Sequence, residues 1–116
     1  CMENKMDWSV RFVKRARQIG VKICAGTDYI NDLNRPFPFL FDELDLYVEK
    51  CDFYPMEAIF SVTRVAAEVL GIADKAGAVE TGMQADLLVL NGNPYDNIKE
   101  LRNIQMVMKR GKILGE

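Results

Sequence analysis

The chain has 116 residues, enough for one small domain or for a part of a larger one. Nearly half of these residues (49%) are apolar, which argues against disorder and allows a buried core. The net charge is −2, from 15 basic and 17 acidic residues that are interspersed, so no basic stripe indicates a nucleic-acid partner. The longest apolar runs, of about five or six residues, are too short to span a bilayer.

The three cysteines, Cys1, Cys24 and Cys51, are odd in number and far apart in the sequence. They form neither a Cys-x-x-Cys pair nor a disulfide framework. Residues 1–7 are polar and show no signal-peptide pattern. We therefore interpret the cysteines as reduced thiols and expect a cytoplasmic protein.

The first predicted elements form half of a β/α unit. A helix is expected over residues 7–18, where Trp8, Phe12, Val13 and Ala16 fall at helical spacing. Gly20 stands where a helix C-cap glycine belongs. A buried strand is expected over residues 21–25, and Asp28 follows it closely.

The middle of the chain is predicted to be a loop followed by two helices. Residues 29–41 combine prolines, asparagines and aromatic side chains, which is typical of a long irregular loop, and loops of this length are either functional or disordered. Helices are expected over residues 41–50 and 54–70, the second with Pro55 in its first turn and Gly71 after its end.

The remainder of the chain is predicted to be mainly β-structure. Short strands are expected over residues 77–82, 85–90, 104–109 and 112–114, with one helical turn over residues 98–101. Arg110-Gly111 is a good tight-turn pair between the last two strands. The change in composition near Gly71 divides the chain into residues 1–71, an α/β portion, and residues 72–116, a mainly β portion.

Asp28 permits two interpretations from the local pattern. A carboxylate at the end of a buried strand is suited to general acid–base catalysis. A Gly-Thr-Asp turn in which Asp28 bonds its own backbone is the commoner meaning of such a tripeptide, and the local pattern alone favours it. The nearby acids Asp42, Glu43 and Asp45 fit a solvated helix face, since negative charge is favourable near a helix N-terminus.

Three stretches together resemble the C-terminal portion of a metal-dependent amidohydrolase of the imidazolonepropionase or prolidase-like kind. "GVKICAGTD" looks like the eighth barrel strand with its terminal aspartate, and "YPMEAIFSVTRVAAEVLGI" is similar to a helix of that family. "AGAVETGMQADLLVLNGNPYDNI" is the most specific of the three, because several fixed positions occur in order at matching spacing. The closing "IQMVMKRGKIL" looks like the hairpin that follows.

The resemblance implies an α/β fold. The chain would hold the last β/α unit of a TIM-type barrel plus the C-terminal strands of a composite β-sandwich, so the barrel is incomplete. It also implies metal-dependent hydrolysis of C–N bonds in amides, cyclic amides or peptides, with zinc or another divalent metal as cofactor. In the complete site Asp28 would touch the metal and act as the catalytic base. Thr27, Tyr29 and Asn31 would be substrate-loop candidates, with Phe37 and Phe39 also bordering the pocket. Packing of the loop side chains over the barrel mouth is an equally good interpretation.

The sequence departs from that family in having no histidine, although histidines supply most of the family's metal ligands. We therefore expect this chain alone to bind no metal and to be inactive. As partners we expect a small amide or peptide substrate for the complete enzyme, and either the missing barrel half or further copies of the chain. Two alternatives remain open: a non-enzymatic α/β domain for binding or assembly, and one subunit of a split amidohydrolase.

Overall fold

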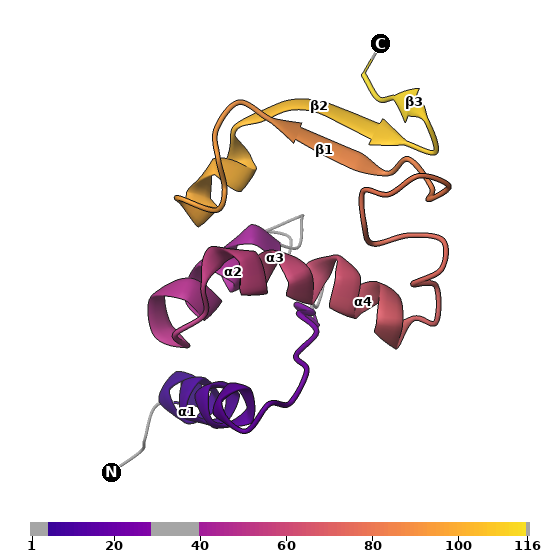
Figure 1. Ribbon diagram of the computed structural model, residues 1–116. Helices are drawn as coiled ribbons and strands as arrows, with labels where there is room; N and C mark the ends of the chain where they lie inside the picture. The colour runs from indigo at the N-terminus through magenta and orange to yellow at the C-terminus, as the bar shows by residue number, and fades with distance from the viewer. Residues whose placement is uncertain (1–4, 29–39, 116) are drawn as a thin grey trace.

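The computed structural model describes residues 5–28 and 40–115, and it arranges them as helices on one side and a small sheet on the other (Figure 1). The helices are α1 (Lys5–Gln18), α2 (Leu40–Lys50), α3 (Pro55–Val62) and α4 (Arg64–Val69). The strands are β1 (Leu87–Leu90), β2 (Ile104–Lys109) and β3 (Lys112–Ile113), with the 3-10 helix η1 (Ile98–Arg102) before β2. In Figure 1, α2 and α3 lie between α1 and the sheet.

The helices end where glycine permits a left-handed backbone, as the sequence predicts. Gly20 has φ +81° and closes α1, while Gly71 has φ +72° and follows α4. At the end of α1, the Val21 N–H donates to the Ala16 carbonyl and the Gly20 N–H donates to the Arg17 carbonyl. This pattern of paired bonds satisfies carbonyls that a helix end otherwise leaves without partners.

The single helix expected over residues 54–70 is divided at Thr63, so that prediction needs correction. The Thr63 hydroxyl donates to the Ile59 carbonyl, four residues back, at 2.8 Å. The Thr63 N–H, which would bond to that carbonyl in a regular α-helix, donates to the Phe60 carbonyl, three residues back. A threonine hydroxyl that takes the carbonyl four residues back competes with the helical hydrogen bond and bends the helix. The helix is therefore interrupted at Thr63, which has φ −120° and ψ −89°, and resumes as α4.

The sheet is an antiparallel meander in the order β1-β2-β3. Leu87 pairs with Met108, and Lys109 pairs with Lys112 across a two-residue turn. That turn is Arg110-Gly111, and both residues have positive φ (+49° and +77°), as a tight hairpin turn of this length requires. The predicted hairpin is confirmed.

Two predicted strands are not strands in the described part of the chain. The stretch of residues 21–27 after α1 runs as an extended trace in Figure 1 but has no strand partner there, and the Ala25 N–H donates to the Ser61 carbonyl of α3 instead. Residues 77–82 turn rather than pair, because Gly77 and Gly82 adopt φ of +96° and +87°. An apolar run predicts an extended backbone, but a strand exists only where a second strand lies alongside it.

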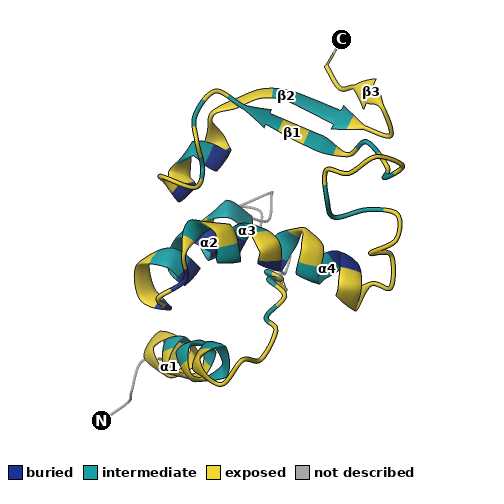
Figure 2. Cartoon of the chain, viewed as in Figure 1, coloured by how far each residue is buried: buried dark blue, intermediate teal, exposed yellow. Residues whose placement is uncertain are grey.

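The core lies where α2 and α3 meet η1, and Figure 2 shows its buried residues on these elements. The buried cluster consists of Leu44, Tyr47, Cys51, Phe53, Ala58, Ile98 and Leu101. Helix α1 contributes no fully buried residue, although Val10 and Val13 pack against the cluster. Cys24 and Cys51 are both free thiols. No helix in residues 5–28 or 40–115 has the length and apolar character needed to cross a membrane.

Asp86 fixes the start of the hairpin, and its protonation should weaken the fold. Its Oδ1 accepts a hydrogen bond from the Arg110 N–H at 2.8 Å. This bond, followed by one from the Gln84 side chain, lowers the pKa of Asp86 below its ordinary value of 3.8. A carboxyl whose pKa is lowered by folding adds stability above its unfolded pKa, and this is lost as the pH falls through its folded pKa.

We therefore expect thermal melting of wild type and of Asp86→Asn to differ at neutral pH and to converge in acid. Asp74→Asn is the control, because Asp74 is an exposed carboxylate elsewhere in the chain. Melting temperatures that run parallel from neutral pH down to below pH 3.8 would contradict the role of Asp86.

Candidate functional site

Asp28 stands at the end of the extended segment that follows α1. Its side chain is exposed and its φ is +43°, in the left-handed region. Aspartate tolerates this region better than most residues because its short polar side chain can bond locally. The backbone at Asp28 is thus compatible with both interpretations of the Gly-Thr-Asp sequence, and its catalytic role stays a prediction.

Two hydrogen bonds hold the segment just before Asp28. The Ala25 N–H donates to the carbonyl of Ser61 in α3 at 3.2 Å. The next amide, of Gly26, donates to Oε1 of Glu43 in α2 at 3.1 Å. Successive N–H groups of an extended chain point to opposite sides, so one residue is held by α3 and the next by α2.

The Glu43 carboxylate is itself held by a buried tyrosine. The Tyr47 hydroxyl donates to the same Oε1 at 2.9 Å, one turn along α2. Burial, and then the hydrogen bond to Glu43, raise the pKa of Tyr47 well above its ordinary range, so it stays a proton donor at physiological pH. Tyr47 also packs on Phe53, with ring centroids 4.8 Å apart.

The other predicted site residues are placed only in part. Thr27 is half-buried next to Asp28. Tyr29 and Asn31, like Phe37 and Phe39, lie outside the described residues. Thus Thr27 and Asp28 are the members of the predicted site that the structure describes, and they are neighbours in sequence.

The residues present do not fit a complete metal site. The sequence has no histidine, and the described ranges hold no group of three or more His, Cys, Asp or Glu side chains close enough to bind an ion. Catalytic metal sites of hydrolases have three protein ligands with an open position. Asp28 could supply one carboxylate of the three protein ligands that such a metal site needs.

The prediction of a solvated face holds for Asp42, whose side chain is 55% exposed, but is wrong for Glu43 and Asp45. Arg102 of η1 contacts Asp42 at 2.7 Å and Asp45 at 2.9 Å, and Lys99 lies 3.2 Å from Glu49. Only 15% of the Asp45 side chain is exposed. The four-residue spacing of Glu43 and Tyr47 could have revealed their contact, since such pairs meet on a helix, but no local pattern indicates the bond to Gly26.

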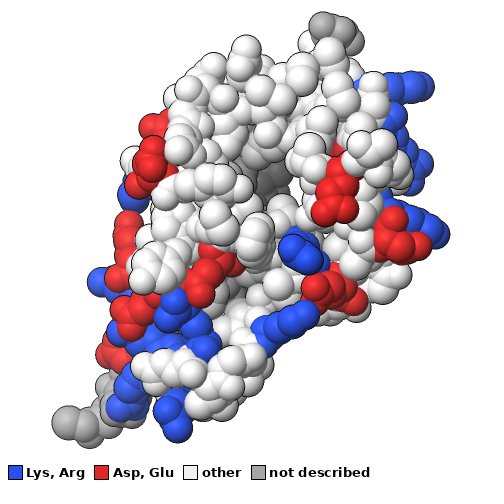
Figure 3. Space-filling view, in the orientation of Figure 1, with Lys and Arg blue, Asp and Glu red and all other residues white. Residues whose placement is uncertain are grey.

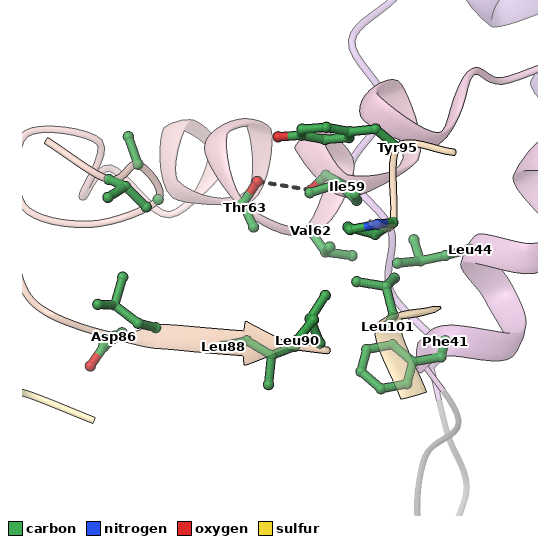
Figure 4. A pocket seen from close by; sticks show the side chains of 15 residues that line it. Phe41, Leu44, Ile59, Val62, Thr63, Asp86, Leu88, Leu90, Tyr95 and Leu101 are labelled. Atoms are coloured by element: carbon green, nitrogen blue, oxygen red, sulfur yellow. Dashed lines mark hydrogen bonds between the residues drawn. The ribbon is translucent and has the colours of Figure 1, made fainter. Parts of the chain in front are cut away.

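A separate apolar cavity of about 340 Å³ lies between the helices and β1, away from Asp28. Figure 4 shows Ile59 and Val62 of α3 along one wall and Leu88 and Leu90 of β1 along the other. Tyr95, Thr63 and Asp86 are its main polar contributors. In Figure 3 the upper middle of the face is uncharged, whereas charges of both signs lie along its left and right edges and across its lower half.

The chain matches known proteins over nearly all of its length. Residues 9–114 match the Amidohydrolase family. The chain is 34% identical over 98 residues to imidazolonepropionase of Thermoplasma acidophilum, covering 82% of this chain and 23% of that protein. It is 35% identical over 79 residues to imidazolonepropionase of Deinococcus radiodurans, covering 68% of this chain and 19% of that protein.

Solved structures agree with these sequence relatives. The crystal structure of a putative prolidase from Bifidobacterium longum is similar with a TM-score of 0.84 and 34% identity, over 92% of this chain and 26% of that one. A Xaa-Pro dipeptidase with methionine bound in its active site is similar with a TM-score of 0.78 and 34% identity, over 90% and 25%. The α/β prediction is thereby confirmed as a mixed domain that matches part of these structures.

The chain spans about a quarter, or less, of the length of these relatives. The match nonetheless covers more than nine tenths of this chain in one structure and most of it in the sequence comparisons. The chain therefore belongs to the amidohydrolase family, and it corresponds to one part of the longer proteins of that family.

Proposed function

We propose that this chain is the C-terminal portion of an amidohydrolase that hydrolyses C–N bonds in amide, cyclic amide or peptide substrates. Residues 1–71 would contribute the last β/α unit of the barrel, and residues 72–116 the C-terminal strands of the β-sandwich. The order of elements supports this division, because an extended segment and helices precede Gly71 and the sheet follows it. The match to prolidase-like structures supports the reaction class.

Asp28 is the residue that we propose to act in this reaction. The observation that carries the proposal is its placement, exposed at the end of an extended segment whose last amides are fixed by two helices. Barrel enzymes place catalytic groups at the C-terminal ends of their strands. An exposed carboxylate there can accept a proton from an attacking water molecule.

The complete site would also hold zinc or another divalent metal, which would make water acidic enough to react at neutral pH. This chain supplies too few ligands for that ion, so we propose that it is inactive by itself. The histidine-bearing remainder of the barrel, or another copy of the chain, would be its partner.

Uncovered apolar surface supports a partner of this kind. The chain exposes 8876 Å², whereas a compact protein of its mass would expose about 6,400 Å². Trp8, Phe12, Val69, Leu70 and Val79 are among the exposed large apolar side chains. Large apolar side chains left exposed together with such excess surface are expected where a partner would cover them.

A chimera tests the proposed function. This chain would replace the matching segment of the Thermoplasma acidophilum imidazolonepropionase, which it resembles over 98 residues. We expect a folded chimera to hydrolyse imidazolonepropionate and Asp28→Asn to lower kcat at least about 100-fold, the lower range for loss of a general base. Asp74→Asn, an exposed acid far along the chain, is the matched control and should leave kcat unchanged.

A folded chimera in which Asp28→Asn retains full activity would refute the proposed role of Asp28. The isolated chain should show no hydrolysis of amides or dipeptides when zinc is added. Hydrolysis by the isolated chain that disappears in Asp28→Asn would refute the proposal that it is inactive alone.

A further inference from the structure

The position of Asp28 depends on how the backbone before it is held. The Gly26 N–H is two residues before Asp28 and donates to Glu43 Oε1 at 3.1 Å. The preceding N–H, of Ala25, donates to the Ser61 carbonyl, and Ser61 is almost fully buried. The Ala25 bond runs between backbone groups, whereas the Gly26 bond depends on one side chain.

Glu43 is built to hold that amide. It lies in the first turn of α2, where a carboxylate is favoured by the unpaired N–H groups of the helix. It is half-buried, and the Tyr47 hydroxyl donates to the same oxygen that receives the Gly26 N–H. Tyr47 is in turn fixed by the core, so the acceptor is oriented by buried packing rather than by solvent.

Loss of the hydrogen bond between Glu43 and the Gly26 N–H would affect the position of Asp28 rather than the overall stability of the protein. Gly26 is exposed, and a Cβ added to it would meet nothing within 4 Å. Without Glu43 its N–H can bond to water at little cost, but the segment then loses one of the two anchors before Asp28. Catalytic groups act only when held within about 0.5 Å of their working geometry.

We propose that Glu43 is a positioning residue, whose carboxylate fixes the Gly26 amide and thereby the direction in which Asp28 is presented. This inference rests on the proposed function, in which Asp28 is the reacting carboxylate. Neither Glu43 nor Tyr47 would touch the substrate.

Amide hydrogen exchange on the full chain, labelled with ¹⁵N, tests the inference at single residues. Glu43→Ala should speed exchange at Gly26 about tenfold, as expected for loss of a hydrogen bond to a charged acceptor. Glu43→Gln should keep most of the protection, because its side-chain oxygen can accept the same bond. The Ala58 amide, in the buried core of α3, reports global opening and should change less than about twofold.

Glu49→Ala is the matched control, because Glu49 is an exposed acid of the same helix and pairs with Lys99 instead. It should leave Gly26 exchange unchanged. Tyr47→Phe should give a smaller increase than Glu43→Ala, since it removes the donor that orients Glu43 but leaves the acceptor.

Unchanged Gly26 exchange in Glu43→Ala would overturn the inference. An equal rise at Ala58 would also overturn it, because the role of Glu43 would then be general stability. Equal loss of protection in Glu43→Gln and Glu43→Ala would rule out a role through this hydrogen bond. Amide exchange does not depend on catalysis. An inactive chimera would therefore refute the proposed function without changing the exchange rates measured at Gly26.

Discussion

Gly77→Ala should destabilise the protein by about 3 kcal/mol or more, although it adds a single methyl group. Gly77 has φ +96°, a conformation that costs a residue with a side chain about 1–2 kcal/mol. In addition, a Cβ at this position would lie 2.6 Å from the Ala67 Cβ and 2.9 Å from the Thr63 carbonyl oxygen. Ala67 lies in α4 and Thr63 directly before it, and neither contact is with the end of a flexible side chain, so the overpacking adds to the backbone cost.

Gly82→Ala separates the two contributions. Gly82 also has a left-handed backbone, with φ +87°, but a Cβ there would meet nothing within 4 Å. Urea unfolding of both variants should therefore show a loss for Gly82→Ala of only about 1–2 kcal/mol, the backbone cost alone. Equal losses in the two variants would contradict close contact between Gly77 and α4.

Leu44→Ala should cost about 3 kcal/mol of unfolding free energy, within the range of 2–5 kcal/mol measured for buried leucines. Leu44 is 0% exposed and belongs to the cluster that joins α2, α3 and η1. Its removal would enlarge the adjacent cavity, which Leu44 also lines.

Leu70→Ala provides the comparison for that loss. Leu70 is 71% exposed at the end of α4, and truncation there should change stability by less than about 0.5 kcal/mol. Denaturant unfolding of the purified variants measures both effects. A loss for Leu44→Ala no greater than for Leu70→Ala would mean that the core is not organised around α2.

Local chemistry predicted much of the fold. Glycine after a helix and a two-residue turn of Arg110 and Gly111 depend on neighbouring residues only, and the structure confirms them. The predictions of strands over residues 21–25 and 77–82 were wrong because strand pairing depends on distant segments, about which a local pattern carries no information. The break at Thr63 was missed because threonine is only a weak helix breaker, and its back-bonding hydroxyl depends on the local backbone.

In the candidate site too, one residue could be identified from the sequence and another depends on contacts between distant segments. The sequence around Asp28 and the downstream resemblance singled out the carboxylate, whose catalytic role stays a prediction. Glu43 was misjudged because its bond to Gly26 spans 17 residues and crosses from a helix to an extended segment. Acidic residues near a helix start usually face water, and only the placement of α2 beside the segment makes this one different.

The two anchors before Asp28 also decide how a neighbouring strand could join this segment. The Val21 amide is used by the end of α1, and the amides of Ala25 and Gly26 are used by α3 and α2. Between them lie the amides of Lys22, Ile23 and Cys24, for which the described residues supply no hydrogen-bond acceptor. Because successive N–H groups alternate in direction, the Lys22 and Cys24 amides face one side of the segment and the Ile23 amide faces the other. A strand that joined the segment before Ala25 would therefore find at most two of these amides on the side that it approached.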